Sequence, residues 1–408
     1  MTIRGFQAMS AVLAMLALPL PCAAEEASPW RLTPGVFGTL GAVYNATDQV
    51  EFRRDVSQTH GAEGGNLSFA TDSLLGLQLN VGYGKQLEFV GQVVSKLNED
   101  NGWEPKLSRG FVRYVPDESL RLRVGRIPQQ FYLRLDSRDV GYSYRTIRPP
   151  VDVYGFASND TLDGADLVWT KAWKDALWNL TLTGGNTQFA VAGVSDTPKL
   201  LLGGLVVDLY YRDWQFRLAG TLVTTREPGR VNPVVAPLRA TGEPQAVQLA
   251  DLLANPGDHY NQVLLAVVYD HGPLLVETLA QRITNNQAVG VAFDNGYATL
   301  GYQLGKFAPY ISFAMMDSHN DLIDTGLSDP AYAQLNRAAR AAQVRAGQVS
   351  DQHSLSLGLR YDLARHFDLK LQIDQVWVDN SQLIIDNRPD PTPNIDMTVI
   401  GLALDFAF

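Results

Sequence analysis

Residues 400–408 read Ile-Gly-Leu-Ala-Leu-Asp-Phe-Ala-Phe, and this stretch decides the fold. Large apolar residues occupy every second position from Ile400 to Phe408, and small or acidic residues occupy the positions between them. Successive side chains of a strand point to opposite faces, so the alternation predicts a β-strand with one fully apolar face. An edge strand of a soluble sheet can show the same pattern, so the rest of the chain must decide between the two settings.

The same alternation recurs along the whole chain. Its clearest apolar faces lie in the segments 75–83, 87–93, 201–211, 214–222, 307–315, 355–361 and 367–373. Aromatic residues such as Tyr83, Tyr211 and Trp214 stand at the ends of these faces, where aromatic girdles meet lipid headgroups. Strands of about ten residues, with apolar side chains towards lipid and polar ones towards a lumen, are typical of transmembrane β-barrels.

The segments between the predicted strands alternate between short and long. Short turns fall at 84–85, 116–119, 173–175, 212–213, 270–272, 305–306 and 363–366. Long connections fall near 45–71, 97–106, 126–163, 184–199, 226–259, 284–294, 317–351 and 379–395. Bacterial barrels have tight periplasmic turns and long external loops. The pattern therefore predicts an all-β fold, a transmembrane antiparallel β-barrel of about 16 strands that occupies 25–408 as one unit.

The first residues resemble an export signal rather than part of the barrel. Arg4 is followed by an apolar run over 8–20 and by small residues up to Ala24. A positive start, a short apolar stretch and small residues before a cut predict a secretory signal peptide over 1–24. Its removal takes away Cys22, which is the one cysteine of the sequence, so no disulfide is expected in the mature protein.

Composition excludes several classes of protein. The formal net charge of −10 argues against a nucleic-acid partner. After Ala24 no run approaches the roughly 20 apolar residues of a transmembrane helix. The 6 histidines show no metal-ligand spacing, and neither a phosphate loop nor a nucleophile elbow occurs. We therefore expect no catalytic residue, no metal site and no cofactor.

The mature sequence resembles the Gram-negative outer-membrane porins. Besides the last strand, the likeness rests on the runs Val-Gly-Arg-Ile-Pro at 124–128, Asp-Ser-Arg-Asp-Val-Gly-Tyr at 136–142 and Arg-Pro-Pro-Val at 148–151. The resemblance implies location in the cell outer membrane, a homotrimer, and passive diffusion of small hydrophilic solutes and ions. It also implies that the third external loop folds into the barrel and narrows the pore.

The third long connection, 126–163, has the content of such a constriction. Its charges are Arg126, Arg134, Arg138, Arg145, Arg148, Asp136, Asp139, Asp152, Asp160 and Asp163. Facing rows of charge are how pores discriminate between ions. Prolines at 128, 149 and 150 would stiffen the path. The alternative is an external loop whose charges only keep it solvated.

The alternation of side chains along two neighbouring strands predicts a basic wall opposite this loop. Val112 and Val124 belong to lipid faces, which turns four arginines towards the lumen: Arg109, Arg113, Arg121 and Arg123. An arginine facing lipid near the midplane would cost about 2–4 kcal/mol. We expect these arginines to give the pore a weak anion preference. They could instead pair with acids such as Glu88 and only hold the wall together.

Two loop segments, 245–254 and 331–345, lack alternation and are rich in Ala and Leu, so they are predicted to be partly helical. They are expected to pack over the external loops. The function expected from the whole sequence is that of an outer-membrane porin. Three alternatives stay open: a substrate-specific channel for small anionic or organic solutes, an outer-membrane barrel enzyme, and an adhesin. The expected partners are outer-membrane lipid and the diffusing solutes.

Overall fold

The computed structural model describes residues 28–97, 102–156, 160–188, 198–227, 233–254, 259–286, 290–388 and 394–408. The signal peptide expected over 1–24 lies outside these residues. None of the helices in the described ranges is long and apolar enough to cross a bilayer.

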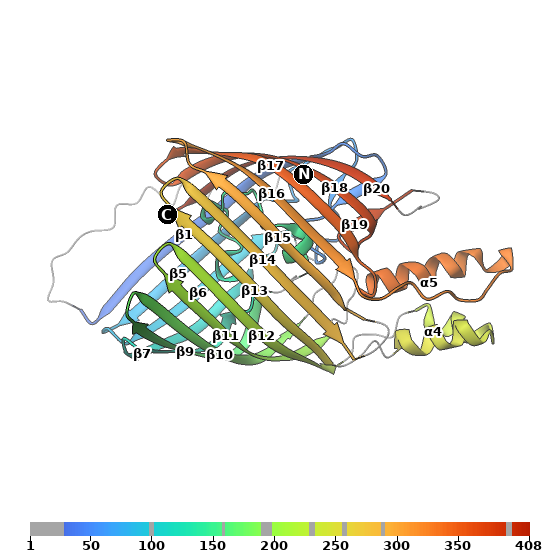
Figure 1. The fold of residues 1–408 in the computed structure, drawn as a ribbon, viewed down its shortest axis with the longest axis horizontal. Coiled ribbons are helices and arrows are strands. Elements are labelled where there is room, and N and C mark those ends of the chain that lie inside the picture. Colours follow the sequence, from blue (N-terminus) through green and yellow to red (C-terminus); the bar gives the residue numbers. More distant parts are fainter. Residues whose placement is uncertain are drawn as a thin grey trace.

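The described chain forms a closed antiparallel β-barrel (Figure 1). Its sheet has 17 strands, of which the two-residue β4 (Leu67–Ser68) only extends the edge of β1, so sixteen strands form the wall. The wall strands are β1 (Trp30–Asn45), β5 (Leu74–Tyr83), β6 (Leu87–Lys96), β7 (Lys106–Asp117), β8 (Leu120–Pro128), β9 (Thr161–Trp173), β10 (Ala176–Gln188), β11 (Lys199–Tyr211), β12 (Trp214–Glu227), β13 (His259–His271), β14 (Leu274–Asn285), β15 (Phe293–Tyr302), β16 (Phe307–Ser318), β17 (Asp351–Ala364), β18 (Phe367–Asn380) and β20 (Ile395–Ala407).

The first and last strands close the barrel. β1 pairs with β5 on one side and with β20 on the other, where Leu40 lies opposite Leu404. Phe408 continues this pairing, because its backbone exchanges hydrogen bonds of 2.8 and 3.2 Å with Val36. A closed sheet has no free edge, which is a requirement inside a bilayer because lipid cannot satisfy backbone polar groups. The predicted strand at 400–408 is thus the strand that seals the barrel.

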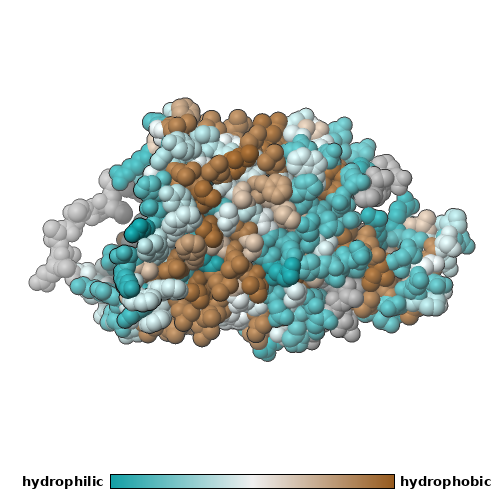
Figure 2. Space-filling model, in the orientation of Figure 1, coloured by the Kyte–Doolittle hydropathy of each residue, from teal (hydrophilic) through white to brown (hydrophobic). Residues whose placement is uncertain are grey.

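The outer face of the wall is apolar, as the alternation predicts. Leu77, Leu265 and Leu402 are among the large apolar side chains that the wall exposes. Figure 2 shows such residues gathered over the barrel wall, with hydrophilic residues towards the end that carries the helices. Exposure on this scale would be an aggregation hazard in water but is what contact with lipid requires.

The third long loop folds into the barrel. We call residues 129–160 L3, since β8 runs to Pro128 and β9 begins at Thr161. L3 contains η1 (Leu135–Ser137), η2 (Gly141–Ser143) and α2 (Val151–Tyr154). Its apolar side chains, such as Phe131, pack against inner-wall residues such as Leu264 on β13 and Leu279 on β14. Each large apolar side chain buried in this way stabilises the docked loop by about 1.5–3 kcal/mol.

The first loop also enters the barrel, which the sequence did not predict. We call residues 46–73 L1 and residues 381–394 L8. Together they form a small sheet of β2 (Val50–Phe52), β3 (Ala62–Glu63) and β19 (Ile384–Asp386). Phe52 pairs with Ile384 and joins an apolar cluster with Val151 of L3 and Val399 of the wall. L1, L3 and L8 therefore fill part of the lumen together.

Three helices pack on one another outside the wall. They are α3 (Val235–Ala240), α4 (Pro244–Ala254) and α5 (Ala333–Arg345), and η3 (Pro330–Tyr332) precedes the last of them. Leu238, Leu249 and Ala339 meet in their shared apolar core. In Figure 1 α4 and α5 extend beyond the strands, at the end opposite the C-terminus. Both helical segments predicted from the sequence are confirmed, whereas the short α3 was not predicted.

Candidate functional site: a charged constriction inside the barrel

The four wall arginines lie on neighbouring strands and share one face. Arg109 and Arg113 are on β7, and Arg121 and Arg123 are on β8. Val124, which follows Arg123 on the opposite face of β8, is exposed, whereas Arg109 and Arg123 are buried. The structure therefore turns all four side chains towards the lumen.

Three of these arginines make ion pairs with acids of the barrel interior. Arg113 pairs with Glu88 and Arg123 with Asp166, and each acid is the residue directly opposite on the neighbouring strand. Arg123 Nε lies 3.0 and 3.1 Å from the two carboxylate oxygens of Asp166. The third pair joins Arg109 Nη2 to Asp160 Oδ2 of L3 at 2.7 Å. Much of the positive charge of the wall is therefore balanced locally.

Arg121 differs from the other three. Within the described ranges it has no hydrogen-bond or ion-pair partner, and its Nε is buried without one. Asp136, at the tip of L3, is exposed and also has no partner there. The two side chains are close enough to interact electrostatically, and Asp136 acts on Arg109 in the same way. Arg121 and Asp136 are thus opposite charges that face each other across the narrowed lumen without pairing.

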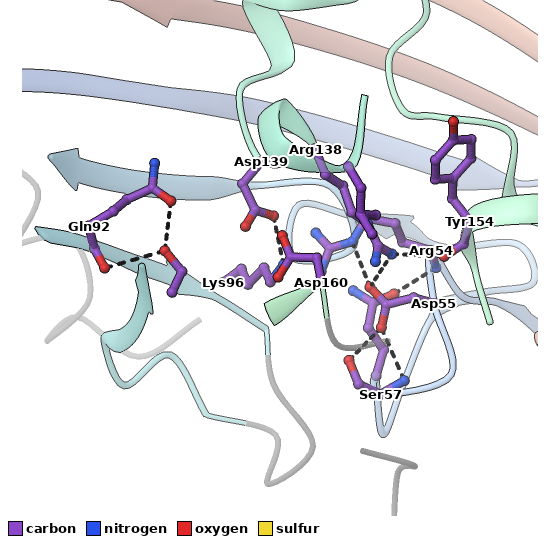
Figure 3. A network of polar contacts seen from close by, with 12 residues as sticks. Arg54, Asp55, Ser57, Gln92, Lys96, Arg138, Asp139, Tyr154 and Asp160 are labelled. Atoms are coloured by element: carbon purple, nitrogen blue, oxygen red, sulfur yellow. Dashed lines mark hydrogen bonds and ion pairs between the residues drawn. The ribbon is translucent and has the colours of Figure 1, made fainter. Parts of the chain in front are cut away.

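Other L3 charges hold the loop to the strands and to L1. Lys96 Nζ lies 2.7 Å from Asp139 Oδ1. Arg138 Nη2 donates to the carbonyl of Tyr154 at 3.0 Å and lies 3.6 Å from Asp55 Oδ2 of L1. Figure 3 shows Asp55 next to Arg138 and Lys96 next to Asp139. Arg138 and Asp139 therefore lie inside the barrel, as predicted for a loop that folds inward.

Two buried acids, Asp55 and Asp160, stay ionised. Burial alone would raise the pKa of Asp55, but the charges of Arg54, Arg138 and Lys96 hold it well below its usual range. Burial also opposes ionisation of Asp160, yet its ion pair with Arg109 lowers its pKa to about 2. Both carboxylates therefore carry charge at neutral pH, as their ion pairs with Arg138 and Arg109 require.

Arg148 is the most tightly held charge of L3. Its Nη1 lies 2.5 Å from Asp72 Oδ2, and its Nη2 lies 2.6 Å from Asp374 Oδ2. The guanidinium also lies over the ring of Phe52, 4.6 Å from the ring centre. One side chain thus joins L3 to L1 and to β18. Asp152, four residues later, is buried and accepts hydrogen bonds from Gln352 and Ser354 at 2.9 and 2.6 Å.

Two further arginines of L3 face the opposite part of the wall. Arg134 Nε lies 2.5 Å from Glu277 Oε2 on β14. Arg145 has neither a hydrogen-bond nor an ion-pair partner in the part of the chain that the structure describes, and its Nη1 is buried. Neither residue touches the wall arginines of β7 and β8.

Arg126, which is predicted to belong to the constriction, lies on β8 rather than in L3. β8 continues through Pro128, so Arg126 keeps the phase of Val124 and points outward from the wall. There its Nε and Nη2 each lie 2.7 Å from a carboxylate oxygen of Asp163 on β9. L3 begins only at residue 129, three residues later than the bound of 126 expected from the sequence.

Several residues of the site were not singled out from the sequence. Asp55 and Arg54 come from L1, which was expected to lie outside, and Lys96 ends β6. Val50, Phe52 and Val56 are a usable signal, because three apolar residues at alternate or nearby positions are unusual in a solvated loop. Asp166 could have been found as a residue in lumen phase on the strand after L3.

A cavity of about 630 Å³ lies beside this network, lined among others by Lys96, Asp139 and Asp160. Among the described residues, no group of three or more His, Cys, Asp or Glu side chains could hold a metal ion. The geometry offers charges and space inside a barrel.

Neither a protein-family model nor a curated protein matches the sequence. Solved structures do match its fold. The outer membrane channel DcaP of Acinetobacter baumannii is 13% identical with a TM-score of 0.56, over 95% of this chain and 100% of that one. An anion-selective porin from Comamonas acidovorans is 13% identical with a TM-score of 0.53, over 93% and 100%. Salmonella typhi OmpF, in a complex with daunomycin, is 11% identical with a TM-score of 0.53, over 92% and 97%. At these identities the likeness concerns the fold, which is that of the Gram-negative outer-membrane porins.

Proposed function

We propose that the protein is a channel of the outer membrane through which small hydrophilic solutes and ions diffuse passively. The observation that carries the proposal is a closed barrel with an apolar outside, whose lumen is narrowed by an inserted charged loop. Solutes would pass between L3 and the wall strands β7 and β8. The fold shared with a channel and with porins supports this function.

Selectivity would depend on the charges that remain unpaired. Arg109, Arg113 and Arg123 are balanced by acids, so Arg121 contributes most of the uncompensated positive field of the wall. Low-dielectric walls focus such a field in the pore. Asp136 opposes it from L3, so the expected preference for anions is weak. The wall arginines would thus divide into three that hold the structure and one that acts on passing ions.

Replacing Arg121 by glutamine is expected to shift the reversal potential in a KCl gradient towards cation selectivity. A unit charge on the order of 10 Å from the ion path changes the energy of an ion by about 0.4 kcal/mol in a water-like dielectric. This energy changes the permeability of each ion by about twofold, downwards for anions and upwards for cations. The ratio of anion to cation permeability should therefore fall by about fourfold. The measurement is bilayer recording of folded wild type and variant.

Lys171→Gln is the control, because Lys171 is an exposed residue of the neighbouring strand β9, in the outward phase of the exposed Trp169 and Trp173. It should leave the reversal potential unchanged. An unchanged potential in Arg121→Gln, or an equal shift in both variants, would contradict the assignment of Arg121 to the pore.

A substrate-specific channel is the second candidate function. The insertion of L1 and L8 beside L3 favours it, because three loops leave less of the lumen open than L3 alone would. Uptake into liposomes distinguishes the two candidates: a general pore gives rates proportional to solute concentration, whereas a specific channel saturates for its solute.

We also propose assembly as a homotrimer, which rests on the resemblance to porins. Chemical cross-linking of the protein in mild detergent should give bands up to a trimer. Recovery of monomers alone would argue against this assembly.

A further inference from the structure

A second cavity lies on the other side of L3. Its volume is about 280 Å³, and it is lined by L3 residues between Arg134 and Tyr154 and by residues of β13, β14, β15 and β17. Asp270, Gln303 and Asp362 at its edge belong to or adjoin the short turns, which places it at the periplasmic end of the barrel. The constriction residues Arg121 and Asp136 do not line it. The cavity is therefore separate from the charged constriction.

The described lining contains three arginines and three acids. Two of the arginines form ion pairs with two of the acids. Arg134 pairs with Glu277 at 2.5 Å. Arg360 Nε lies 2.8 Å from Asp362 Oδ1, and its Nη1 donates to two carbonyl oxygens of L3 at 2.8 Å. These contacts fasten L3 to the wall, so four of the six charges have structural roles.

Arg145 is the cation left over. It has no partner within the described ranges, and its Nη1 has neither a partner nor access to solvent. The Arg145 side chain packs against Gly301 of β15, where an added Cβ atom would lie 3.1 Å from Cδ and from Nη1. A buried donor without an acceptor costs about 1–3 kcal/mol, which an anionic group of a ligand would recover.

Asp270 is the acid left over. Its carboxylate has no hydrogen-bond or ion-pair partner in the part of the chain that the structure describes. Of the charges around Arg145, that of Asp270 acts on it most strongly. The two groups line one cavity but lie further apart than a salt bridge allows, so there is space for a molecule between them.

We infer that this cavity binds a small zwitterion of the α-amino-acid type, with its carboxylate on Arg145 and its ammonium group on Asp270. The three positive and three negative lining charges sum to zero, so a solute with a net charge would leave one of the two groups unmatched. Tyr144 and Pro149 offer apolar surface to the carbon part of such a solute. The volume is near the lower end for small-molecule pockets, which suits a molecule of this size. The inference goes beyond the proposed diffusion channel, because it concerns binding rather than conduction.

Calorimetric titration of the purified barrel in detergent tests the inference, with L-glutamine as the probe. Saturable binding is expected in the wild type. Arg145→Gln and Asp270→Asn should each weaken it by at least about tenfold, since each removes one of the two charged contacts. Arg365→Gln and Asp175→Asn, exposed charges in other periplasmic turns, should bind glutamine like the wild type.

Two further probes test the ligand class on the wild type alone, so the result does not depend on whether a variant folds. Acetate and methylammonium each carry one of the two charged groups, and each should bind far more weakly than glutamine. Absence of saturable glutamine binding would overturn the inference. So would binding that is insensitive to both substitutions, or acetate binding as tight as that of glutamine. Bilayer conductance is independent of these outcomes and tests the channel separately.

Discussion

Replacement of Arg148 by methionine is expected to release L3 from the wall while the barrel still assembles. The Arg148 side chain is 5% exposed and bridges the buried carboxylates of Asp72 and Asp374. Methionine keeps much of the apolar volume but leaves both carboxylates without a cation. Removing one partner of a buried ion pair costs about 3–5 kcal/mol, which is comparable to the docking energy of a loop.

The released loop should be detected by limited proteolysis within 129–160 and by a larger, noisier conductance. The triple variant Arg148→Met, Asp72→Asn, Asp374→Asn should recover much of the docking, because a neutral buried set carries no unpaired charge. Arg239→Met is the matched control, since Arg239 makes an exposed ion pair with Asp251 on the outer helices, worth about 0–1 kcal/mol. If Arg148→Met keeps the proteolysis pattern and conductance of the wild type, the proposed anchoring role is wrong.

Replacement of Gly141 by valine is expected to displace the tip of L3 by steric conflict. A Cβ atom at this position would lie 2.1 Å from Asp405 Oδ1 and 2.6 Å from Thr39 Oγ1, both on the wall. The carbonyl of Gly141 also accepts a hydrogen bond of 2.7 Å from Lys370, which is fully buried. Overpacking costs about 1–3 kcal/mol. Loss of the Gly141 carbonyl as acceptor for the buried Lys370 costs a similar amount.

Hydrogen exchange of the amides over 137–144 measures this displacement. Protection should fall in Gly141→Val, and the conductance should rise because the loop leaves the lumen. Gly91→Val is the control, since a Cβ at Gly91 meets no atom within 4 Å on the outer wall. Equal protection in Gly141→Val and the wild type would show that the tip of L3 does not rest on the wall at this point.

The barrel was predictable because the direction of a strand side chain depends on its position within the strand and not on distant residues. A strand in a bilayer must alternate, so Leu402 and Leu77 reveal their outward direction from sequence neighbours alone. The same phase placed Arg113 and Arg121 in the lumen correctly. Arg126 was assigned to the loop from the bounds 126–163 of the third long connection, whereas β8 runs to Pro128 and pairs Arg126 with Asp163 of β9.

The ion-pair partners of most charged side chains could not be predicted from the sequence. Arg109 meets Asp160, 51 positions away, and Arg148 meets Asp374, 226 positions away. Such pairs depend on how a loop crosses the lumen, which alternation does not encode. The pairing of wall arginines with acids was considered as an alternative, and the structure confirms it for Arg113 with Glu88.

The inward fold of L3 was predicted from the resemblance to porins and from its charges, whereas the apolar residues of L1 at 50, 52 and 56 were not interpreted as a signal. The insertion of L1 depends on Phe52 and Val56 finding apolar partners on L8, L3 and the wall. These partners come from segments hundreds of residues away. Pairing between two loops is therefore only weakly predictable from the sequence of either loop.

Single-channel recording of the purified, folded protein in a planar bilayer tests the central claim most directly. The account predicts discrete conductance steps on insertion, a current proportional to voltage, and a reversal potential in a KCl gradient that shows a weak preference for anions. A protein that is folded by circular dichroism and inserts into the bilayer, yet gives no conductance steps, would contradict the claim that this barrel is a passive channel.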